Sequence, residues 1–365
     1  MSTFVRVAPF ASLTVAVALA AGCSPTPTPS PPPPTATAAS SPTPSATPTL
    51  RPTTTPAPPP TPSPTPPALG ARWTYAELGA GQVLDIAHGD AGYVAVGSTG
   101  CADGCLGSAG AWFSADGLTW SNVTIPDGEE FYVHTVATDG STWYAGGDRF
   151  EQTGVITGHI WQSTDARTWE LIKSFEVGKC GEGCPTIGML AARPGSALLT
   201  SPFGLVGATR DGYLLAAGTI AWETGGAGDL VHRIKFLGDY QGGRIAENGR
   251  RVAILQGVCG ARTCFTRAWS AANGRTDWTS KDRPTAIPWT EPSLLVVSGG
   301  SFITAGAAAP AGIGVFTSQD GLTWTRIPDD LSMGPDCQLM ALSGTDDQLV
   351  VAPSCGSGVW VSNGG

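Results

Sequence analysis

Three segments of the chain share one short pattern, and this repeat constrains the fold more than any other feature. The segments are SADGLTW at 114–120, STDARTW at 163–169 and SQDGLTW at 318–324. In each, Ser precedes an Asp by two residues and Thr-Trp ends the segment. An Asp that accepts backbone N–H bonds, helped by a Gly with positive φ, is typical of a tight turn between strands. We call the three segments the Ser-Asp turns and expect each to close a β-hairpin.

Each Ser-Asp turn belongs to a longer repeat that contains two hairpins. An apolar and aromatic stretch precedes the turn, and an alternating stretch follows it; a fourth copy of this outer hairpin lies at 267–282. A second hairpin pattern comes before each outer hairpin, at 84–98, 136–148, 245–257 and 342–354. A repeat of four antiparallel strands is typical of a β-propeller blade. We therefore predict an all-β chain folded as a β-propeller.

The spacing of the repeats indicates the number of blades. The tryptophans that end the outer-hairpin turns are Trp120, Trp169, Trp278 and Trp324. The gap between Trp169 and Trp278 is about twice the other two gaps, so residues 186–237 hold at least one irregular blade without a Ser-Asp turn. One such blade gives six blades in total, which is our prediction. Two short blades in the same stretch give seven, which is the alternative.

The two ends of the repeat region complement one another. GVWVSNGG at 358–365 provides the first strand of an outer hairpin but no second strand. ARWTY at 71–75 matches the strand that follows a Ser-Asp turn and has no first strand before it. We expect the N-terminal strand to complete the last blade and so close the ring.

The Ser-Asp turns resemble the Asp-box, or BNR repeat, of sialidase-like propellers, whose pattern is Ser/Thr-x-Asp-x-Gly-x-Thr-Trp. Here one residue fewer separates Asp from Gly, and the segment 163–169 lacks the Gly. In that family the box lies between the third and fourth strands of a blade, away from the substrate face. The resemblance implies that its residues shape the fold and carry no chemistry. They are Ser114, Asp116, Gly117, Trp120, Ser163, Asp165, Trp169, Ser318, Asp320, Gly321 and Trp324.

The N-terminus predicts export and anchoring. Arg6 precedes an apolar run at 7–21, which is too short for a stable membrane-spanning helix. The run ends in Ala-Ala-Gly-Cys23-Ser, which resembles a bacterial lipobox. We expect residues 1–22 to be a signal peptide and Cys23 to be the lipidated N-terminus of the mature chain. The lipid anchors the chain to the outer face of the bacterial cell membrane.

Residues 23–68 predict a disordered stalk. The stretch 24–68 contains 19 prolines in 45 residues and a single charged residue, Arg51. Such a composition buries too little apolar surface to offset its conformational entropy. The folded domain is therefore predicted at 69–365, and all 29 acidic residues lie within it.

The remaining eight cysteines fall in local pairs, which in an exported chain favours disulfides. The expected bonds are Cys101–Cys105, Cys180–Cys184, Cys259–Cys264 and Cys337–Cys355. None of the four histidines is near these pairs in sequence, so we expect no metal and no cofactor. The net charge of −9 argues against a nucleic-acid partner. We expect a monomer whose membrane contact is the lipid on Cys23.

The face opposite the Ser-Asp turns is the predicted binding face. In a propeller it carries the loops between second and third strands and between blades, and here these loops are long: 98–110, 125–131, 147–159, 176–186 and 256–264. Binding residues are often placed on such loops over a rigid scaffold. The candidate side chains are Glu129, Glu130, Phe131, Arg149, Glu151, Glu182 and Arg262.

A catalytic role has little support in the sequence. The resemblance to sialidases would require three arginines that hold a carboxylate, a Tyr-Glu pair and an aspartic acid. Arg72 is the one arginine of the predicted domain before the first turn, and Arg326-Ile327-Pro328 follows the last turn on an outer strand. We therefore predict no catalytic residues and a membrane-anchored, non-catalytic binding or scaffold module for a protein or glycan. The alternatives are a sialidase-like glycoside hydrolase and a propeller chaperone that resembles photosystem assembly factors.

Overall fold

The computed structural model of the chain describes a series of ranges between Trp73 and Asn363. They are 73–99, 107–179, 186–200, 204–234, 243–259, 264–272, 276–284, 287, 294–307, 313–327, 331 and 337–363. All of these residues belong to one unit, Ser63–Gly365. The expected signal peptide, lipidated Cys23 and stalk lie outside the described residues.

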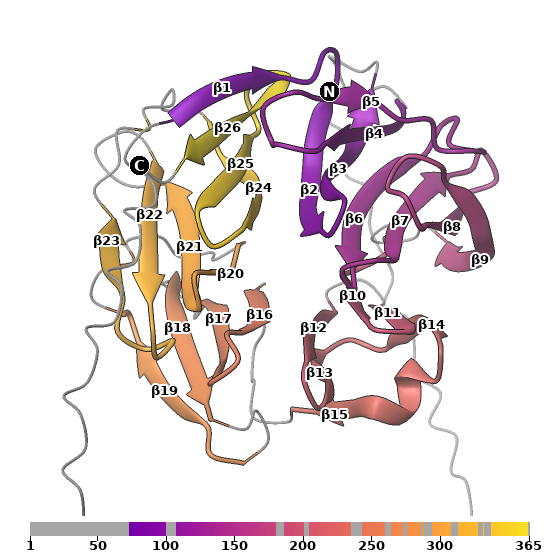
Figure 1. Cartoon of the computed structure of the whole chain (residues 1–365). Helices are drawn as coiled ribbons and strands as arrows, with labels where there is room; N and C mark the ends of the chain where they lie inside the picture. The colour runs from indigo at the N-terminus through magenta and orange to yellow at the C-terminus, as the bar shows by residue number, and fades with distance from the viewer. Residues whose placement is uncertain are drawn as a thin grey trace, which may run out of the picture. The chain divides into compact units, whose positions relative to one another are not determined.

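Seven β-sheets surround a common centre, as Figure 1 shows. The innermost strand of each sheet contacts the innermost strand of the next, from β2 around to β24 and back to β2. Five sheets have four antiparallel strands. Blade 1 contains β2 (Gln82–Gly89), β3 (Gly92–Thr99), β4 (Ser108–Ser114) and β5 (Ser121–Asn122), and blade 2 contains β6 (Tyr132–Thr138), β7 (Trp143–Phe150), β8 (Val155–Ser163) and β9 (Glu170–Lys179).

The other four-stranded blades follow the two short ones. Blade 5 contains β16 (Gly243–Glu247), β17 (Val252–Cys259), β18 (Cys264–Ala271) and β19 (Thr279–Asp282). Blade 6 contains β20 (Val296–Ser298), β21 (Ser301–Ala307), β22 (Ile313–Ser318) and β23 (Thr325–Ile327). Blade 7 contains β24 (Leu339–Gly344), β25 (Gln348–Pro353), β26 (Gly358–Asn363) and β1 (Trp73–Glu77). The pairing of β1 with β26, from Trp73↔Ser362 to Glu77↔Gly358, confirms the predicted ring closure.

Blades 3 and 4 have three strands each, and their strands alternate along the chain. Blade 3 contains β10 (Leu190–Arg193), β11 (Ser196–Thr200) and β14 (Ile220–Thr224). Blade 4 contains β12 (Leu205–Thr209), β13 (Gly212–Ala217) and β15 (Val231–Arg233). After β11 the chain leaves blade 3 and forms the β12–β13 hairpin of blade 4. It then returns to blade 3, where β14 pairs with β11. After the short helix η1 (Ala227–Leu230) it enters blade 4 again, where β15 pairs parallel to β13.

The propeller has seven blades, so our prediction of six is wrong and the alternative is correct. The two short blades occupy the stretch in which we expected a single irregular blade. Neither of them has a Ser-Asp turn. A blade of three strands lacks the outer hairpin that such a turn would close, so both blades escaped a count based on that motif.

The hydrophobic core is divided among the junctions between neighbouring blades. Seven clusters of buried side chains lie there, one at each junction. Seven consecutive residues of β3 are buried. An inner strand is buried in this way because a neighbouring blade covers each of its two faces. The same burial on both faces explains why these strands are continuously apolar.

Hydrogen bonds also link every pair of neighbouring blades. They lie on the face of the propeller that carries the turns between the first and second strands of each blade. At least one such bond crosses each of the seven junctions. In ring order they are Asp90 N to Gly140 O (2.8 Å), Gly195 N to Asp139 Oδ2 (3.3 Å), Arg193 Nη2 to Arg210 O (2.7 Å), Arg210 Nε to Glu247 Oε1 (2.5 Å), Asn248 Nδ2 to Gly300 O (3.0 Å), Gly299 N to Asp346 Oδ1 (2.9 Å) and Gln348 Nε2 to Asp116 O (3.1 Å).

Candidate functional site

The Ser-Asp turns join the third and fourth strands of blades 1, 2 and 6. In the first turn, Asp116 Oδ1 accepts the N–H groups of Leu118 and Thr119 at 2.9 and 2.7 Å. Ser114 Oγ accepts the N–H of Gly117 at 2.8 Å, and Gly117 has φ of 76°. Backbone donors in the turn, that of Thr119 above all, hold the pKa of Asp116 below its usual range. The donors that the carboxylate accepts from the described residues therefore all come from its own turn.

The other two Ser-Asp turns repeat this arrangement. Asp320 Oδ1 accepts the N–H groups of Leu322 and Thr323 at 2.8 and 2.6 Å. Asp165 Oδ1 accepts the N–H of Thr168 at 2.6 Å, and this bond is the largest of the causes that lower the Asp165 pKa. Ala166 occupies the glycine position of that turn at φ of 62°, which explains how the turn forms without glycine.

The tryptophans of these turns pack between blades. Trp324 is 5% exposed and lies against Ala253, Leu255 and Ala268 of blade 5. Its indole Nε1 donates to Gly321 O at 3.2 Å. Trp169 packs likewise at the junction of blades 1 and 2. The turns thus attach an outer hairpin to the neighbouring blade.

The structure describes part of the predicted binding face. Glu182, Arg262, Cys101, Cys105, Cys180 and Cys184 lie outside the described residues. Cys259 and Cys264 are cross-strand partners in β17 and β18, but their side chains are likewise not described. Cys337 and Cys355 form a disulfide with their Cα atoms 5.3 Å apart, as we expected. This bond joins the open end of the β24–β25 hairpin.

Phe131, which we expected at the binding surface, is buried. It is 1% exposed, stacks on His159 with ring centroids 4.0 Å apart and meets the edge of Trp161 at 5.7 Å. The Arg149 guanidinium lies 5.1 Å from the Phe131 ring centroid. An apolar ring at the start of β6 gains more from the junction of blades 1 and 2 than from water. Phe131 therefore belongs to the core at the junction of blades 1 and 2, and the prediction that it lies at the surface is wrong.

Arg149 and Glu151 lie together at the end of β7. Arg149 Nη2 donates to Glu151 Oε1 at 2.9 Å, and Thr157 Oγ1 donates to the same oxygen at 2.9 Å. The bond from Arg149 and the bond from Thr157 lower the pKa of Glu151. Burial lowers the pKa of neighbouring His159, and the charge of Arg149 adds to this effect. These two candidate residues form one ion pair, about one third exposed, on the loop face.

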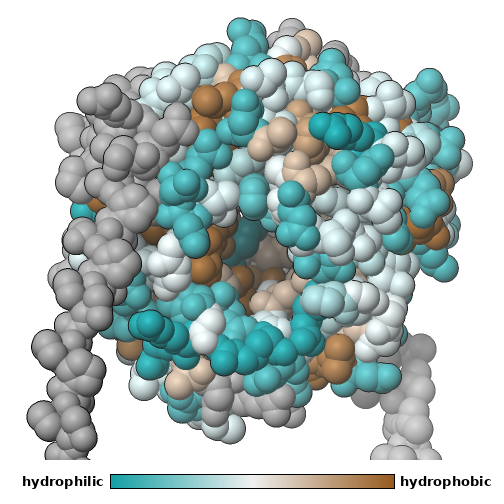
Figure 2. All heavy atoms as spheres, viewed as in Figure 1, coloured by the Kyte–Doolittle hydropathy of each residue, from teal (hydrophilic) through white to brown (hydrophobic). Residues whose placement is uncertain are grey.

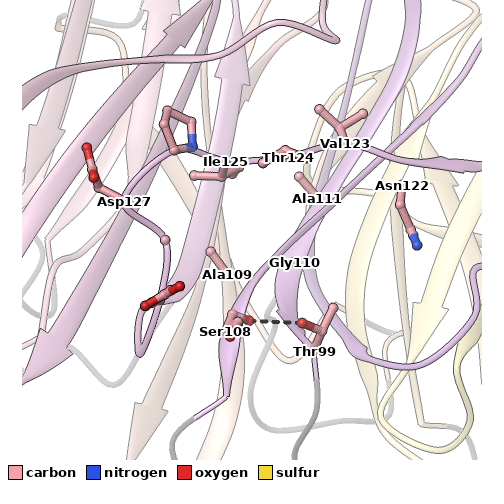
Figure 3. Close-up of a pocket in the computed structure, with 13 residues that line it drawn as sticks. Thr99, Ser108, Ala109, Gly110, Ala111, Asn122, Val123, Thr124, Ile125 and Asp127 are labelled. Atoms are coloured by element: carbon pink, nitrogen blue, oxygen red, sulfur yellow. Dashed lines mark hydrogen bonds between the residues drawn. The ribbon is translucent and has the colours of Figure 1, made fainter.

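Glu129 lines an open slot beside β4, whereas Glu130, the next residue, does not line it. The fourth strand of blade 1 ends after Asn122, and residues 123–128 then bow away from β4 (Figure 3). Hydrogen bonds close both ends of the bow, from Val123 N to Ala111 O at 2.9 Å and from Ala109 N to Gly128 O at 2.8 Å. The slot between them has a volume of about 450 Å³.

The slot is lined by small polar and apolar residues with an acidic margin. Ser108, Asn122 and Thr124 contribute hydroxyl and amide groups, and Asp127 and Glu129 contribute carboxylates. No basic side chain belongs to the lining among the residues that the structure describes. Such a surface accepts hydrogen bonds and favours neutral or cationic groups over anions. Nine of the thirteen lining residues come from two of the loops that the sequence indicated, 98–110 and 125–131, and the other four are Ala111, Asn122, Val123 and Thr124.

The bowed segment is held by a bond from blade 2 and by a bond within its own turn. Trp161 Nε1 of blade 2 donates to Pro126 O at 2.7 Å, and Phe131 N donates to Gly128 O at 3.3 Å. Asp127 and Glu130 have φ of 53° and 62°, in the left-handed region that disfavours such residues. Backbone strain of this kind persists where surrounding contacts enforce it and is concentrated at functional sites. The slot is therefore preorganised.

A second cavity, of about 340 Å³, lies at the centre of the ring. Residues from the inner edge of all seven blades line it, and Figure 2 shows a central hollow with hydrophobic residues on its wall. Its charged lining residues are Asp85 on β2 and Arg244 on β16, among the residues that the structure describes. Neither was among the candidates predicted from the sequence.

Asp85 connects three blades. Its Oδ2 accepts Thr135 Oγ1 at 3.1 Å and Val136 N at 3.0 Å, both on β6. Thr135 Oγ1 in turn accepts Leu190 N of β10 at 3.3 Å. Burial raises the pKa of Asp85, while the charge of Arg244 and these donors act against that rise. An acidic residue within the apolar run LDIAHG was the signal for this site in the sequence.

Neither cavity has the composition of a metal centre. No group of three or more His, Cys, Asp or Glu that could hold a metal ion occurs in the described part of the chain. The described helix is also too short to cross a membrane, and no other helix within these residues could do so.

The chain matches no protein-family model and no curated protein. Solved structures of similar shape include YCF48 bound to D1 peptide, at 14% identity and TM-score 0.42, over 82% of this chain and 99% of that one. The GH93 α-L-arabinofuranosidase of Fusarium graminearum with arabinobiose has 12% identity and TM-score 0.49, over 79% and 96%. A subtype N10 neuraminidase-like protein of A/little yellow-shouldered bat/Guatemala/060/2010 has 8% identity and a TM-score of 0.42, over 80% of this chain and 98% of that one. At these values the likeness establishes no family or activity for this chain.

Proposed function

We propose that the chain is an exported, lipid-anchored binding module, related to the sialidase-like Asp-box propellers, that uses the slot beside β4 to bind a protein or glycan partner. The observation that carries the proposal is the slot itself. It is open, rigidly held and placed on the face opposite the Ser-Asp turns. The proline-rich stretch 24–68 would carry this face on the order of 100 Å from the lipid, at about 3.1 Å per residue if extended.

The chemistry of the slot favours a partner that donates hydrogen bonds. Backbone carbonyls, hydroxyls and the carboxylates of Asp127 and Glu129 accept such bonds, and a carboxylate strengthens a bond from a cationic donor. A basic peptide segment and a hydroxyl-rich glycan both satisfy this requirement. Catalysis is not required by this arrangement, since two acids on one open margin do not define the fixed carboxylate pair of a glycosidase.

Binding can be tested with the mature chain in detergent on a glycan array and an immobilised peptide library. Asp127→Ala combined with Glu129→Ala should weaken capture at least tenfold, because charge-assisted hydrogen bonds are lost. Asp211→Ala, an exposed acid on the opposite face, is the matched control and should bind like the wild type. Equal binding by both variants would remove the slot from the proposal. Hydrolysis of a sialoside or another glycoside would replace the binding role by an enzymatic one.

Anchoring is tested separately. The lipobox-like sequence before Cys23 supports lipidation, and Cys23→Ala should release the chain from the membrane fraction and block signal-peptide removal. Detergent phase partition and the mass of the mature N-terminus measure these two effects. If the variant is processed and retained on the membrane like the wild type, the chain has another attachment.

A further inference from the structure

The central cavity carries two opposite charges on walls that are mostly aliphatic, with His88, Thr135 and Thr138 as the other polar residues. Asp85 comes from blade 1 and Arg244 from blade 5, and they form no ion pair with each other within 4.0 Å. Most other lining positions are Ala, Val, Leu or Ile. Asp85 and Arg244 are both half-buried in this open hollow, and the water that each charge loses there is costly unless a partner compensates it. None of the residues that line this cavity also lines the slot.

Arg244 keeps its carboxylate-binding edge unoccupied. Both of its hydrogen bonds to the described residues come from Nη1, to Met189 S at 3.6 Å and to its neighbour Gly243 O at 3.2 Å. Nε and Nη2 bond no described residue. These two nitrogens form the planar fork that holds a carboxylate through two parallel hydrogen bonds.

Asp85 keeps acceptor capacity on one oxygen. Its Oδ2 already accepts two donors from β6, whereas Oδ1 accepts one donor from the described part of the chain, the N–H of Ile86 at 3.0 Å. A carboxylate oxygen has two lone pairs, so Oδ1 can take one more donor. A ligand ammonium at this position would compensate the Asp85 charge directly.

We infer that the central cavity binds a small zwitterion, namely an α-amino acid with an aliphatic side chain. Its carboxylate pairs with the Nε–Nη2 edge of Arg244, its ammonium group with Asp85 Oδ1, and its side chain with the apolar wall. A volume of about 340 Å³ holds on the order of ten groups the size of a water molecule, which admits such an amino acid and excludes a folded peptide. The binding is reversible and involves no covalent step.

Isothermal titration of the mature chain with L-leucine, L-isoleucine and L-valine tests this inference. At least one should bind, and 4-methylpentanoate and 3-methylbutylamine, each with one of the two charges, should bind at least tenfold more weakly. Arg244→Gln should weaken amino-acid binding at least tenfold. Arg244→Lys should have an intermediate effect, since it keeps the charge without the fork.

The matched control is Arg250→Gln, on an exposed turn of the same blade, which should bind the amino acid like the wild type. The slot variant Asp127→Ala/Glu129→Ala should also bind it normally, so failure of one site is distinguishable from failure of the other. Absence of binding for all three amino acids overturns the inference. Equal affinity for the amino acid and for 4-methylpentanoate or 3-methylbutylamine overturns it as well. So does unchanged amino-acid binding by Arg244→Gln.

Discussion

Trp324 offers a direct test of how the blades are held together. The change is Trp324→Ala, which removes an indole that is 5% exposed at the junction of blades 5 and 6. The void would lie in the cluster that contains Phe302 and Phe316 of its own blade and Ala253 of blade 5. Because the blades on both sides belong to a ring that is closed through the pairing of β1 with β26, the site can collapse little.

The expected loss can be derived from the burial of the side chain. A tryptophan buries about 150–250 Å², and at about 25 cal/mol per Å² this area corresponds to roughly 4–6 kcal/mol as an upper limit. Alanine retains a small part of that area, whereas the void and the lost bond to Gly321 O, worth about 1 kcal/mol, add to the cost. We expect the free energy of unfolding to fall by about 4 kcal/mol.

Urea denaturation followed by far-UV circular dichroism measures this loss from the midpoint and slope. Trp324→Phe keeps an aromatic ring but loses the indole N–H and should cost about 1–2 kcal/mol. Leu118→Ala, at a side chain 37% exposed in another Ser-Asp turn, should change the free energy by less than about 0.5 kcal/mol. A loss below about 1 kcal/mol for Trp324→Ala at unchanged slope would refute the reasoning.

Two further predictions concern the turns and the disulfide. Donors within the turns hold the pKa values of Asp116 and Asp165 below their usual range. These carboxylates therefore stabilise the fold at pH values above their pKa in the unfolded chain, about 4, and the contribution is lost as the pH falls below it. Between neutral pH and about pH 3, the free energy of unfolding should therefore fall less for Asp165→Asn than for the wild type. An equal fall in the two proteins would contradict this. Removing the Cys337–Cys355 disulfide, which spans 18 residues, by a double change to serine should cost about 2–4 kcal/mol in thermal unfolding, and an unchanged midpoint would show that the hairpin holds without it.

The fold was predictable from the sequence to the extent that turns carry side-chain signals. Ser114, Asp116 and Gly117 each have a local role in their own turn, so the motif predicts that turn wherever it occurs. The number of blades was not predictable in this way. β14 pairs with β11 across an intervening hairpin, and β15 pairs parallel with β13, so neither short blade has a contiguous pattern.

The sequence indicates where the long loops lie, because loop length is visible in it, but not how their side chains are arranged. Described residues of the loops 98–110 and 125–131 line part of the slot beside β4, and Ala111, Asn122, Val123 and Thr124 line the rest. The burial of Phe131 was not visible, since the charged residues Glu129 and Glu130 before it suggest exposure. Asp85 and Arg244 lie far apart in the chain, and only closure of the ring brings them to one cavity.

The exchange of strands between blades 3 and 4 restricts how the gene for this propeller can change. A blade made of consecutive strands can be duplicated or deleted by one recombination event, and the ring can then adjust its circumference. Between β10 and β15 no cut separates one blade from the other, because β12 and β13 lie between β11 and its partner β14. Blades 3 and 4 must therefore be inherited, gained or lost together as a double unit. Homologues with a different number of blades are expected to differ elsewhere in the ring, or here by two.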